Sequence, residues 1–310
     1  MSSYLQNLTI RLAEGLGKID EPLRNRHRDY LFGQQQDDGG FRGRMGESDL
    51  YYTAFGLRGL SILGELYGEP AERAARFLKQ EVGKRQTIVD FFSLFYAANL
   101  LSVSAGIDVL DESDTEWRDR VHQFLSTLRR NDGGFSKAAE GVAGSTYHTF
   151  LILLVYELMQ RAIPDPAGVV SFLDSQFDAD GGWKEIRASK RPGTNPTAAA
   201  VATLTILNQL KQEQSEPTID FLLDMQNDEG GLRANTRIPI ADLLSSFTGA
   251  LSLCDLNAGH ELDWDAYERY VNSLQLETGG FQAAVWDESH DVEYTFYGLG
   301  CLALIANQKR

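Results

Sequence analysis

The sequence predicts an all-α protein in which six helix-hairpin repeats close into a ring. Two observations lead to this prediction: a glycine pair recurs along the 310-residue chain, and a helix-length apolar segment follows each pair. The first glycine of each pair stands at positions 39, 133, 181, 230 and 279, so the successive spacings are 94, 48, 49 and 49. Because the first spacing is about twice the others, we expect a repeat without a glycine pair at EVGKRQT, residues 81–87.

Each repeat is predicted to begin with a helix that has one polar and one apolar face. In EWRDRVHQFLSTLRR, apolar residues recur at helical spacing, as Val121, Phe124, Leu125 and Leu128 do. The glycine-pair turn follows, because glycine adopts backbone angles that other residues avoid. These elements predict a single domain over residues 1–310, with repeats at 21–68, 69–115, 116–163, 164–214, 215–262 and 263–310.

The last element of each repeat is predicted to be a helix that is apolar nearly all round. The segments are DLYYTAFGLRGLSIL, IVDFFSLFYAANLLSV, STYHTFLILLVYELM, NPTAAAVATLTILNQL, ADLLSSFTGALSLC and DVEYTFYGLGCLALI. A helix without a polar face must be buried on all sides, so these six helices would form an inner ring within the amphipathic ones. A closed ring leaves no terminal repeat with an exposed apolar face, whereas an open superhelix is the structural alternative.

Composition excludes several classes of function. The hydrophobic content is 43%, and the net charge of −15 argues against binding to nucleic acid or to anionic membranes. No stretch approaches the roughly 20 apolar residues of a membrane span, and the first twenty residues do not resemble a signal peptide. Cys254 and Cys301 are the only cysteines and form no CxxC pattern, so we expect a cytoplasmic protein.

The segment SFLDSQFDADGGW, in which Gln176 precedes the glycine pair and Trp183 follows it, resembles the QW repeat of the α/α-toroid enzymes. These are the protein prenyltransferase β subunits, the triterpene cyclases and the class II diterpene cyclases. The resemblance covers the whole chain and implies a single (α/α)6 toroid, or barrel, most similar to a geranylgeranyl-type prenyltransferase β subunit. It implies an isoprenoid or other apolar small molecule as ligand and a helical α-subunit-like partner, with a homodimer as the alternative.

The resemblance also implies positions for a zinc site. In a register rotated by one repeat, DVEYTFYGL resembles the inner helix that carries a D-x-C-Y zinc motif, and GGFRGRMGESDLYYTAFGLRGLSILG resembles the helix that carries D-x-x-H-T. Asp291 is then the only retained zinc ligand, Glu293 stands in the cysteine column, and Tyr52 stands in the histidine column. Tyr294 matches the tyrosine of the family motif.

In the unrotated register, the zinc columns would hold Asp242, Leu244 and Tyr294. In either register, two of the three zinc ligands are replaced, so the zinc site is degenerate and we expect no bound zinc and no other cofactor. Carboxylate and phenol oxygens suit Mg²⁺ better than a zinc thiolate.

The diphosphate site of the family is also altered. The segment QAAVWDESH, between the last glycine pair and Asp291, contains no lysine or arginine. Guanidinium groups elsewhere could bind phosphate oxygens, and the candidates are Arg42, Arg44, Arg233 and Arg237. Ordinary surface arginines are the alternative interpretation.

The same acidic segment has a second resemblance. D-V-E-Y-T, residues 291–295, is similar to the D-x-D-D-T acid motif of class II terpene cyclases, with Glu293 in the proton-donor column and Asp291 beside it. The candidate catalytic residues are therefore Glu293, Asp291, Tyr294 and Tyr52. The alternative is structural, because Asp49, Asp242 and Asp291 each precede an inner helix and aspartate is a preferred N-cap.

Aromatic residues on the predicted inner helices could line an apolar pocket. The candidates for this substrate cavity are Tyr51, Phe55, Phe92, Tyr147, His148 and Tyr297. If these side chains instead fill a solid core, the protein would be a non-catalytic binding or interaction scaffold.

Overall fold

The computed structural model describes residues 3–84, 87–110 and 116–309, and these residues form thirteen α-helices. The helices are α1 (Tyr4–Leu16), α2 (Glu21–Gln34), α3 (Leu50–Leu63), α4 (Gly68–Glu81), α5 (Ile88–Ala105), α6 (Glu116–Thr127), α7 (Thr146–Leu158), α8 (Pro166–Gln176), α9 (Thr194–Ile206), α10 (Gln212–Asp224), α11 (Leu243–Asp255), α12 (Trp264–Ser273) and α13 (Val292–Gln308). A 3₁₀-helix covers Gly259–Glu261, and the strands β1 (Gln282–Ala284) and β2 (Asp287–His290) form a small antiparallel hairpin.

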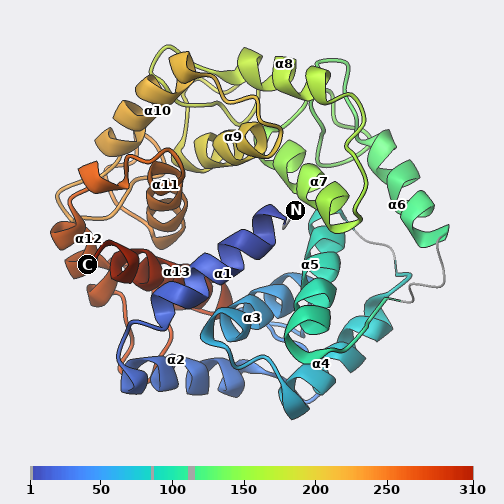
Figure 1. Ribbon diagram of the computed structural model, residues 1–310, viewed down its shortest axis with the longest axis vertical. Helices are drawn as coiled ribbons and strands as arrows, with labels where there is room; N and C mark the ends of the chain where they lie inside the picture. The colour runs from blue at the N-terminus through green and yellow to red at the C-terminus, as the bar shows by residue number, and fades with distance from the viewer. Residues whose placement is uncertain (1–2, 85–86, 111–115, 310) are drawn as a thin grey trace. The chain divides into compact units, whose positions relative to one another are not determined.

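The chain divides into two compact units, one formed by residues 1–113 and 268–310 and the other by residues 114–267. In unit 1, the apolar helices α13, α3 and α5 pack side by side in that order, and α2 and α4 pack against them (Figure 1). In unit 2, α7, α9 and α11 form a similar row, which α8 and α10 contact. We call the apolar helices of each row inner helices and the amphipathic helices outer helices.

A turn that contains the glycine pair joins each outer helix to the next inner helix in five repeats. The first glycine of each pair has a φ angle between +90° and +94°, which side chains with a Cβ atom rarely adopt. This glycine also contacts the backbone of the following outer helix so closely that a Cβ atom would collide with a carbonyl oxygen. The contacts are Gly39 with Arg73, Gly133 with Gly168, Gly181 with Pro217, Gly230 with Ala266, and Gly279 with Arg26.

The last of these contacts joins the two ends of the chain within unit 1. Gly279 belongs to the last glycine pair, whereas Arg26 lies on α2, the first outer helix. His27 strengthens the same junction, because its Nδ1 atom accepts a hydrogen bond of 3.1 Å from the backbone N–H of Gly280. The last repeat therefore packs against the first, a contact that a closed ring of repeats requires.

A hydroxyl group from the inner helix fixes four of the turns. The residue after the glycine pair donates its backbone N–H to a buried threonine or serine, with a distance of 2.9 Å in each case. The pairs are Phe41 with Thr53, Phe135 with Thr149, Trp183 with Thr197, and Leu232 with Ser246. The aromatic or leucine side chain can then be buried while its backbone polar group stays hydrogen-bonded.

Helix α1 lies outside the six predicted repeats. It begins with a capping box between Ser3 and Gln6, and it packs on α13 and α3. Gly15 lies directly against the backbone of Ala303 in the C-terminal half of α13, and the Thr9 hydroxyl lies 3.1 Å from the Tyr96 hydroxyl on α5. Helix α1 therefore covers unit 1 away from the N-terminal ends of its inner helices (Figure 1).

Two details differ from the sequence prediction, and a third part of the prediction lies partly outside the described residues. The acidic segment before α13 contains the hairpin β1–β2, which the prediction of an all-α chain did not include. Helix α5 is long and apolar enough to cross a membrane, but 56% of it is buried and it packs against α3 and α4, as a core helix does. In the second repeat, α4 ends at Glu81 and α5 begins at Ile88; residues 85–86 and the repeat boundary at 115 lie outside the described residues.

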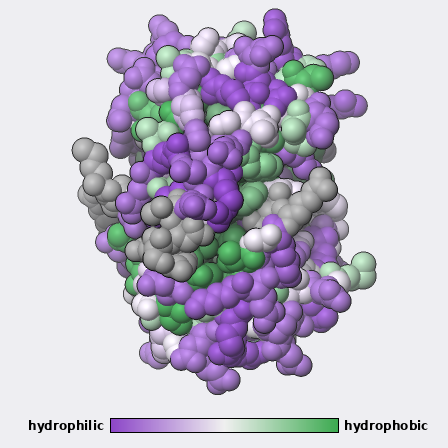
Figure 2. Space-filling model, turned by 90° about the vertical axis from the view of Figure 1, so that its right-hand side faces the viewer, coloured by the Kyte–Doolittle hydropathy of each residue, from purple (hydrophilic) through white to green (hydrophobic). Residues whose placement is uncertain are grey.

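The surface agrees with the acidic, polar composition. Hydrophilic side chains predominate on the face seen in Figure 2, and hydrophobic side chains form smaller areas among them. The apolar residues of the inner helices account for much of the buried core, such as Leu57, Leu60, Val201 and Leu299.

Candidate functional site

The acidic segment forms the N-terminal end of α13. Asp291 is its N-cap, and Oδ1 accepts hydrogen bonds from the backbone N–H groups of Glu293 at 2.9 Å and Tyr294 at 3.1 Å. Asp49 and Asp242 cap α3 and α11 in the same way, so the predicted capping role of all three aspartates is confirmed. Helix capping therefore explains why an aspartate precedes an inner helix at the same position of the repeat in both units.

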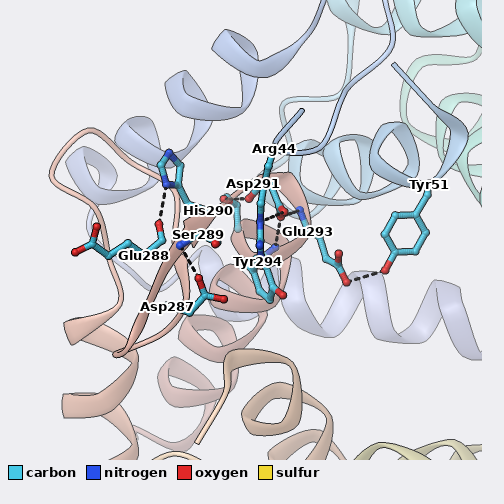
Figure 3. A network of polar contacts seen from close by, with 10 residues as sticks. Arg44, Tyr51, Asp287, Glu288, Ser289, His290, Asp291, Glu293 and Tyr294 are labelled. Carbon is cyan, nitrogen blue, oxygen red and sulfur yellow. Dashed lines mark hydrogen bonds and ion pairs between the residues drawn. The ribbon is translucent and has the colours of Figure 1, made fainter. Parts of the chain in front are cut away.

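Glu293 lies one residue into α13 and points toward α3 (Figure 3). Its Oε1 atom accepts a hydrogen bond of 2.7 Å from the Tyr51 hydroxyl. Burial raises the pKa of Glu293, and the neighbouring Asp291 raises it further, whereas the hydrogen bond from Tyr51 and the charge of Arg58 lower it. A carboxyl group in such surroundings keeps its proton to a higher pH than an exposed glutamate does.

Asp291 is nearly fully buried, with 3% of its side chain exposed. Burial raises the pKa of Asp291, while the helix N–H groups and Arg44 oppose that effect. The Arg44 Nε atom lies 3.6 Å from Asp291 Oδ2, and its guanidinium carbon lies 5.4 Å from the centre of the Tyr294 ring. The charges of Asp291 and Glu293 also raise the pKa of Tyr52, after burial as the main cause, so Tyr52 lies close to both carboxyl groups. The four predicted catalytic residues are thereby brought together at one end of unit 1.

A pocket of about 380 Å³ opens beside this cluster. Its lining comes from the end of α2, the loop before α3 and the hairpin before α13, and consists of Gln34, Arg42, Gly43, Arg44, Glu288, Ser289, His290 and Asp291. Two of the predicted phosphate-binding residues, Arg42 and Arg44, therefore share a pocket with two acidic side chains. An anion bound there would meet both attraction and repulsion.

Four of the predicted cavity residues, Tyr51, Phe55, Phe92 and Tyr297, lie in unit 1. The Tyr51 and Phe55 rings are 5.0 Å apart, and the Phe55 and Tyr297 rings are 5.4 Å apart. Phe92 on α5 joins the same cluster through Arg58, because the guanidinium carbon of Arg58 lies 4.5 Å from the Phe55 ring centre and 5.1 Å from the Phe92 ring centre. Phe55 and Phe92 are only 4% and 7% exposed, so they belong mainly to the hydrophobic core. Tyr51 and Tyr297 are half-buried, so part of each side chain is accessible.

Sequence reasoning missed Arg58, which lies at the centre of that aromatic cluster. Its guanidinium carbon lies 4.5 Å from the ring centre of Phe55, 5.1 Å from Phe92, 4.6 Å from Tyr96 and 5.8 Å from Phe296. These rings come from three helices, α3, α5 and α13. One signal in the sequence could have identified this residue: Arg58 is the only charged residue in the segment Leu50–Leu63, which is predicted to be a buried helix.

The residues in the zinc columns do not fit a zinc ion. Among the described residues, no three His, Cys, Asp or Glu side chains lie close enough together to hold a metal. Asp291 uses its Oδ1 atom to cap α13, and Glu293 is held by Tyr51. Zinc in proteins favours sulfur and imidazole ligands, and here the surrounding donors are carboxylate and phenol oxygens.

The remaining predicted residues belong to unit 2. Ser145 caps α7, and its hydroxyl lies 2.7 Å from His148 Nδ1 and also donates to Glu185. The backbone N–H of Tyr147 donates to the other oxygen of Glu185 at 3.3 Å. Burial lowers the pKa of His148 to about 4 and raises that of Glu185. In a catalytic triad, the histidine lies between the serine and the acidic residue. Here Ser145 lies between His148 and Glu185, so the arrangement is that of a helix cap rather than of a catalytic triad.

Arg233 and Arg237 are likewise in unit 2. Arg233 donates to the backbone oxygen atoms of Asp224 and Met225 at the end of α10, so it has a structural role there. Arg237 is exposed in the loop before α11. These two arginines therefore belong to a different unit from the pocket that contains Arg42 and Arg44.

Comparison with known proteins finds the same fold in enzymes that act on isoprenoids and also in a glycoside hydrolase. The family model "Prenyltransferase alpha-alpha toroid domain" matches residues 8–95 and 74–309. No curated protein matches the chain. The structure of the Candida albicans protein geranylgeranyltransferase-I complexed with GGPP has a TM-score of 0.73 and 17% identity, and the alignment covers 91% of each chain.

Two further structures resemble the chain at lower identity. A type II terpene cyclase from Scytonema, in complex with geranylgeranyl dihydroxybenzoate, has a TM-score of 0.65 and 12% identity over 97% of this chain and 99% of its own. An alpha-1,6-mannanase from Salegentibacter has a TM-score of 0.60 and 12% identity over 93% and 99% of the two chains. At these identities the likeness establishes the fold alone, since the three proteins differ in their chemistry.

Proposed function

The chain belongs to the prenyltransferase alpha-alpha toroid family, and we propose that it binds an isoprenoid or similar apolar small molecule on the aromatic surface of unit 1. The observation that carries this proposal is the cluster of Tyr51, Phe55, Phe92, Phe296 and Tyr297 around the polar ends of Glu293 and Arg58. Small-molecule sites are typically apolar, with a few polar groups that fix the orientation of the ligand. Two proteins of the same fold are complexed with geranylgeranyl compounds, which supports the isoprenoid class.

Zinc-dependent transfer of a prenyl group to a thiol is not part of this proposal. That chemistry needs a metal-bound thiolate, and Asp291, Glu293 and Tyr52 supply oxygen donors that are already engaged or shielded. The diphosphate site is proposed to be degenerate as well, because Arg42 and Arg44 share their pocket with Asp291 and Glu288. Metal analysis of the purified protein tests this part, and one zinc per chain held by these side chains would contradict it.

An acid-initiated cyclase that uses Glu293 is the second candidate. The raised pKa of Glu293 and its position beside aromatic rings favour it, because a protonated carboxyl group can donate to an alkene. The position of Arg58 argues against the cyclase function. The faces of Phe55, Phe92, Tyr96 and Phe296 are turned to a guanidinium group, and a permanent positive charge there would repel a carbocation.

A binding experiment tests the leading function. Geranylgeraniol should bind to the purified chain with measurable heat in calorimetry, and Tyr297→Leu should weaken binding by about tenfold, since it removes a half-buried ring from the proposed surface. Tyr67→Leu is the matched control, because the Tyr67 ring is 60% exposed in the same unit and should leave affinity unchanged. Failure of the wild-type chain to bind any polyprenyl compound would refute the proposal.

Product analysis separates the two candidates. Incubation with geranylgeranyl diphosphate or squalene, followed by extraction, should return the substrate unchanged if the protein only binds. A cyclised product that disappears in Glu293→Gln would instead establish the cyclase function, because glutamine accepts the Tyr51 hydrogen bond but cannot donate a proton as an acid.

A further inference from the structure

Arg58 is a cation in an aromatic environment rather than in a polar one. Rings from α3, α5 and α13 surround its guanidinium carbon at 4.5 to 5.8 Å from their centres. Cation–π contact stabilises the charge but satisfies none of the five N–H donors of the group. The side chain therefore keeps its full capacity for hydrogen bonding while it is partly removed from water.

The donors of Arg58 are not used within the part of the chain that the structure describes. The Nε atom is buried and has no hydrogen-bond partner there, and neither a hydrogen bond nor an ion pair engages the rest of the guanidinium. Buried polar groups without partners are rare in native proteins, because each costs about 1–3 kcal/mol. By contrast, Arg130 and Arg233 each use their guanidinium groups on several carbonyl oxygens.

Glu293 does not pair with Arg58. Glu293 feels the charge of Arg58, yet its Oε1 atom accepts from Tyr51 and no ion pair joins the two residues. Arg58 and Glu293 thus lie on the same aromatic surface without forming an ion pair with each other. Such an arrangement leaves the outer nitrogens of the guanidinium available, because the side chain as a whole is only half-buried.

We propose that Arg58 binds the carboxylate of an amphiphilic ligand whose apolar chain lies on the surrounding aromatic rings. This inference rests on the proposed function and specifies its ligand class as an isoprenoid carboxylic acid. The planar guanidinium matches a carboxylate through two parallel N–H···O hydrogen bonds, and such charge-assisted pairs are stronger than neutral ones. The bound carboxylate would satisfy outer N–H donors that the protein leaves unpaired.

A carboxylate fits this position better than a diphosphate does. Asp291 and Glu293 both lie at the N-terminal end of α13, and their carboxyl groups would oppose a ligand group with two or three negative charges more than a group with one. A single carboxylate carries one charge, which Arg58 neutralises. The N–H donors of a guanidinium group lie in its plane, so its edge can pair with a small planar anion such as a carboxylate.

The experiment compares three ligands with the same C20 chain. Geranylgeranoic acid, geranylgeraniol and geranylgeranyl diphosphate are titrated separately into the purified full chain at pH 7, below their aggregation concentrations. The acid should bind the wild type at least about tenfold more tightly than the alcohol, the gain of a charge-assisted pair. Arg58→Met should remove this preference and leave the affinity for the alcohol within about twofold, because methionine keeps the apolar volume of the stem. Arg58→Lys should retain part of the preference.

Arg76→Met is the matched control, because Arg76 lies exposed on α4 of the same unit. It should change none of the three affinities. Equal affinities of acid and alcohol for the wild type, or an unchanged preference in Arg58→Met, would overturn the role of Arg58 while leaving the proposed function intact. Tighter binding of the diphosphate than of the acid would overturn the choice of carboxylate. Absence of binding by all three ligands would refute the proposed function itself.

Discussion

Tyr51 on α3 donates a hydrogen bond of 2.7 Å to Glu293 on α13, although 242 positions separate the two residues in the chain. The contact exists because the last repeat packs against the first within unit 1, as the contact between Gly279 and Arg26 also requires. It joins the two inner helices at the end where the acidic residues gather. The ionisation of Glu293 is therefore coupled to the packing of these helices.

The first prediction concerns Glu293→Gln. The folded pKa of Glu293 lies above its unfolded value of 4.5, so the folded state binds the proton more tightly, and stability falls as pH rises from 4.5 through the folded pKa. Glutamine resembles the protonated acid at every pH. The variant should match the wild type near pH 4 and exceed it at pH 8, by about 1.4 kcal/mol for each pH unit between the two pKa values.

Urea unfolding at several pH values measures this difference. Glu277→Gln serves as control for the loss of one carboxyl group, because Glu277 is exposed in the last glycine-pair turn. A stability difference for Glu293→Gln that stays constant from pH 4 to pH 8 would show that burial does not govern this carboxyl group.

The second prediction tests the close approach at the glycine pairs. Gly39 has φ +91°, and a Cβ atom there would collide with the carbonyl oxygen of Arg73 on α4. Gly39→Ala should cost at least about 2 kcal/mol, because α4 must move as well as the turn. Gly64 has φ +75° with open space around it, so Gly64→Ala should cost only about 1 kcal/mol, the price of the left-handed backbone. Equal losses in the two variants would mean that the contact with α4 is unimportant.

The sequence predicts those parts of the molecule that local periodicity determines. The glycine pairs mark the turns, and the uncharged helix-length segments mark the inner helices, because burial and backbone geometry act on neighbouring residues. Asp291 could be predicted as a cap for the same reason. The environment of Arg58 could not, because its rings come from helices far apart in the chain and only tertiary packing brings them together. The docking of α1 through Gly15 on Ala303 likewise has no local signal.

The third prediction concerns acid unfolding through His27. This side chain is fully buried, stacks on Phe281 with ring centres 4.7 Å apart, and accepts the N–H of Gly280 at Nδ1. Burial lowers the pKa of His27 to about 4, below the unfolded value of 6.5. The unfolded state therefore binds more protons between these values, and stability that is complete above pH 6.5 is lost as pH falls toward 4, by roughly 3 kcal/mol.

The imidazole resonances of His27 should accordingly titrate near pH 4 in NMR spectra. In His27→Gln, the loss of stability between pH 6.5 and pH 4 should become smaller by roughly 3 kcal/mol, whatever the stability of the variant at pH 7. A titration midpoint near 6.5 in the folded protein would contradict this account of the junction.

The fourth prediction separates the capping role of Asp291 from a chemical one. Asp291→Asn keeps a side-chain oxygen for the N–H groups of Glu293 and Tyr294, whereas Asp291→Ala does not. The alanine variant should lose about 1 kcal/mol. The asparagine variant should be at least as stable as the wild type at pH 7, because burial raises the pKa of Asp291 and opposes its charge. Arg44 will not reverse this order, since its side chain is 44% exposed and the separation of 3.6 Å is screened by water.

Asp49→Asn provides the matched comparison, because Asp49 caps α3 through the N–H of Tyr52 in the same unit. If Asp291 acts only as a cap, its asparagine variant should keep full affinity for a polyprenyl ligand, as the Asp49 variant should. A loss of ligand binding in Asp291→Asn, with stability preserved, would instead place the buried carboxylate in the binding site. Equal loss of stability in the asparagine and alanine variants would mean that the charge, rather than the cap, holds the start of α13.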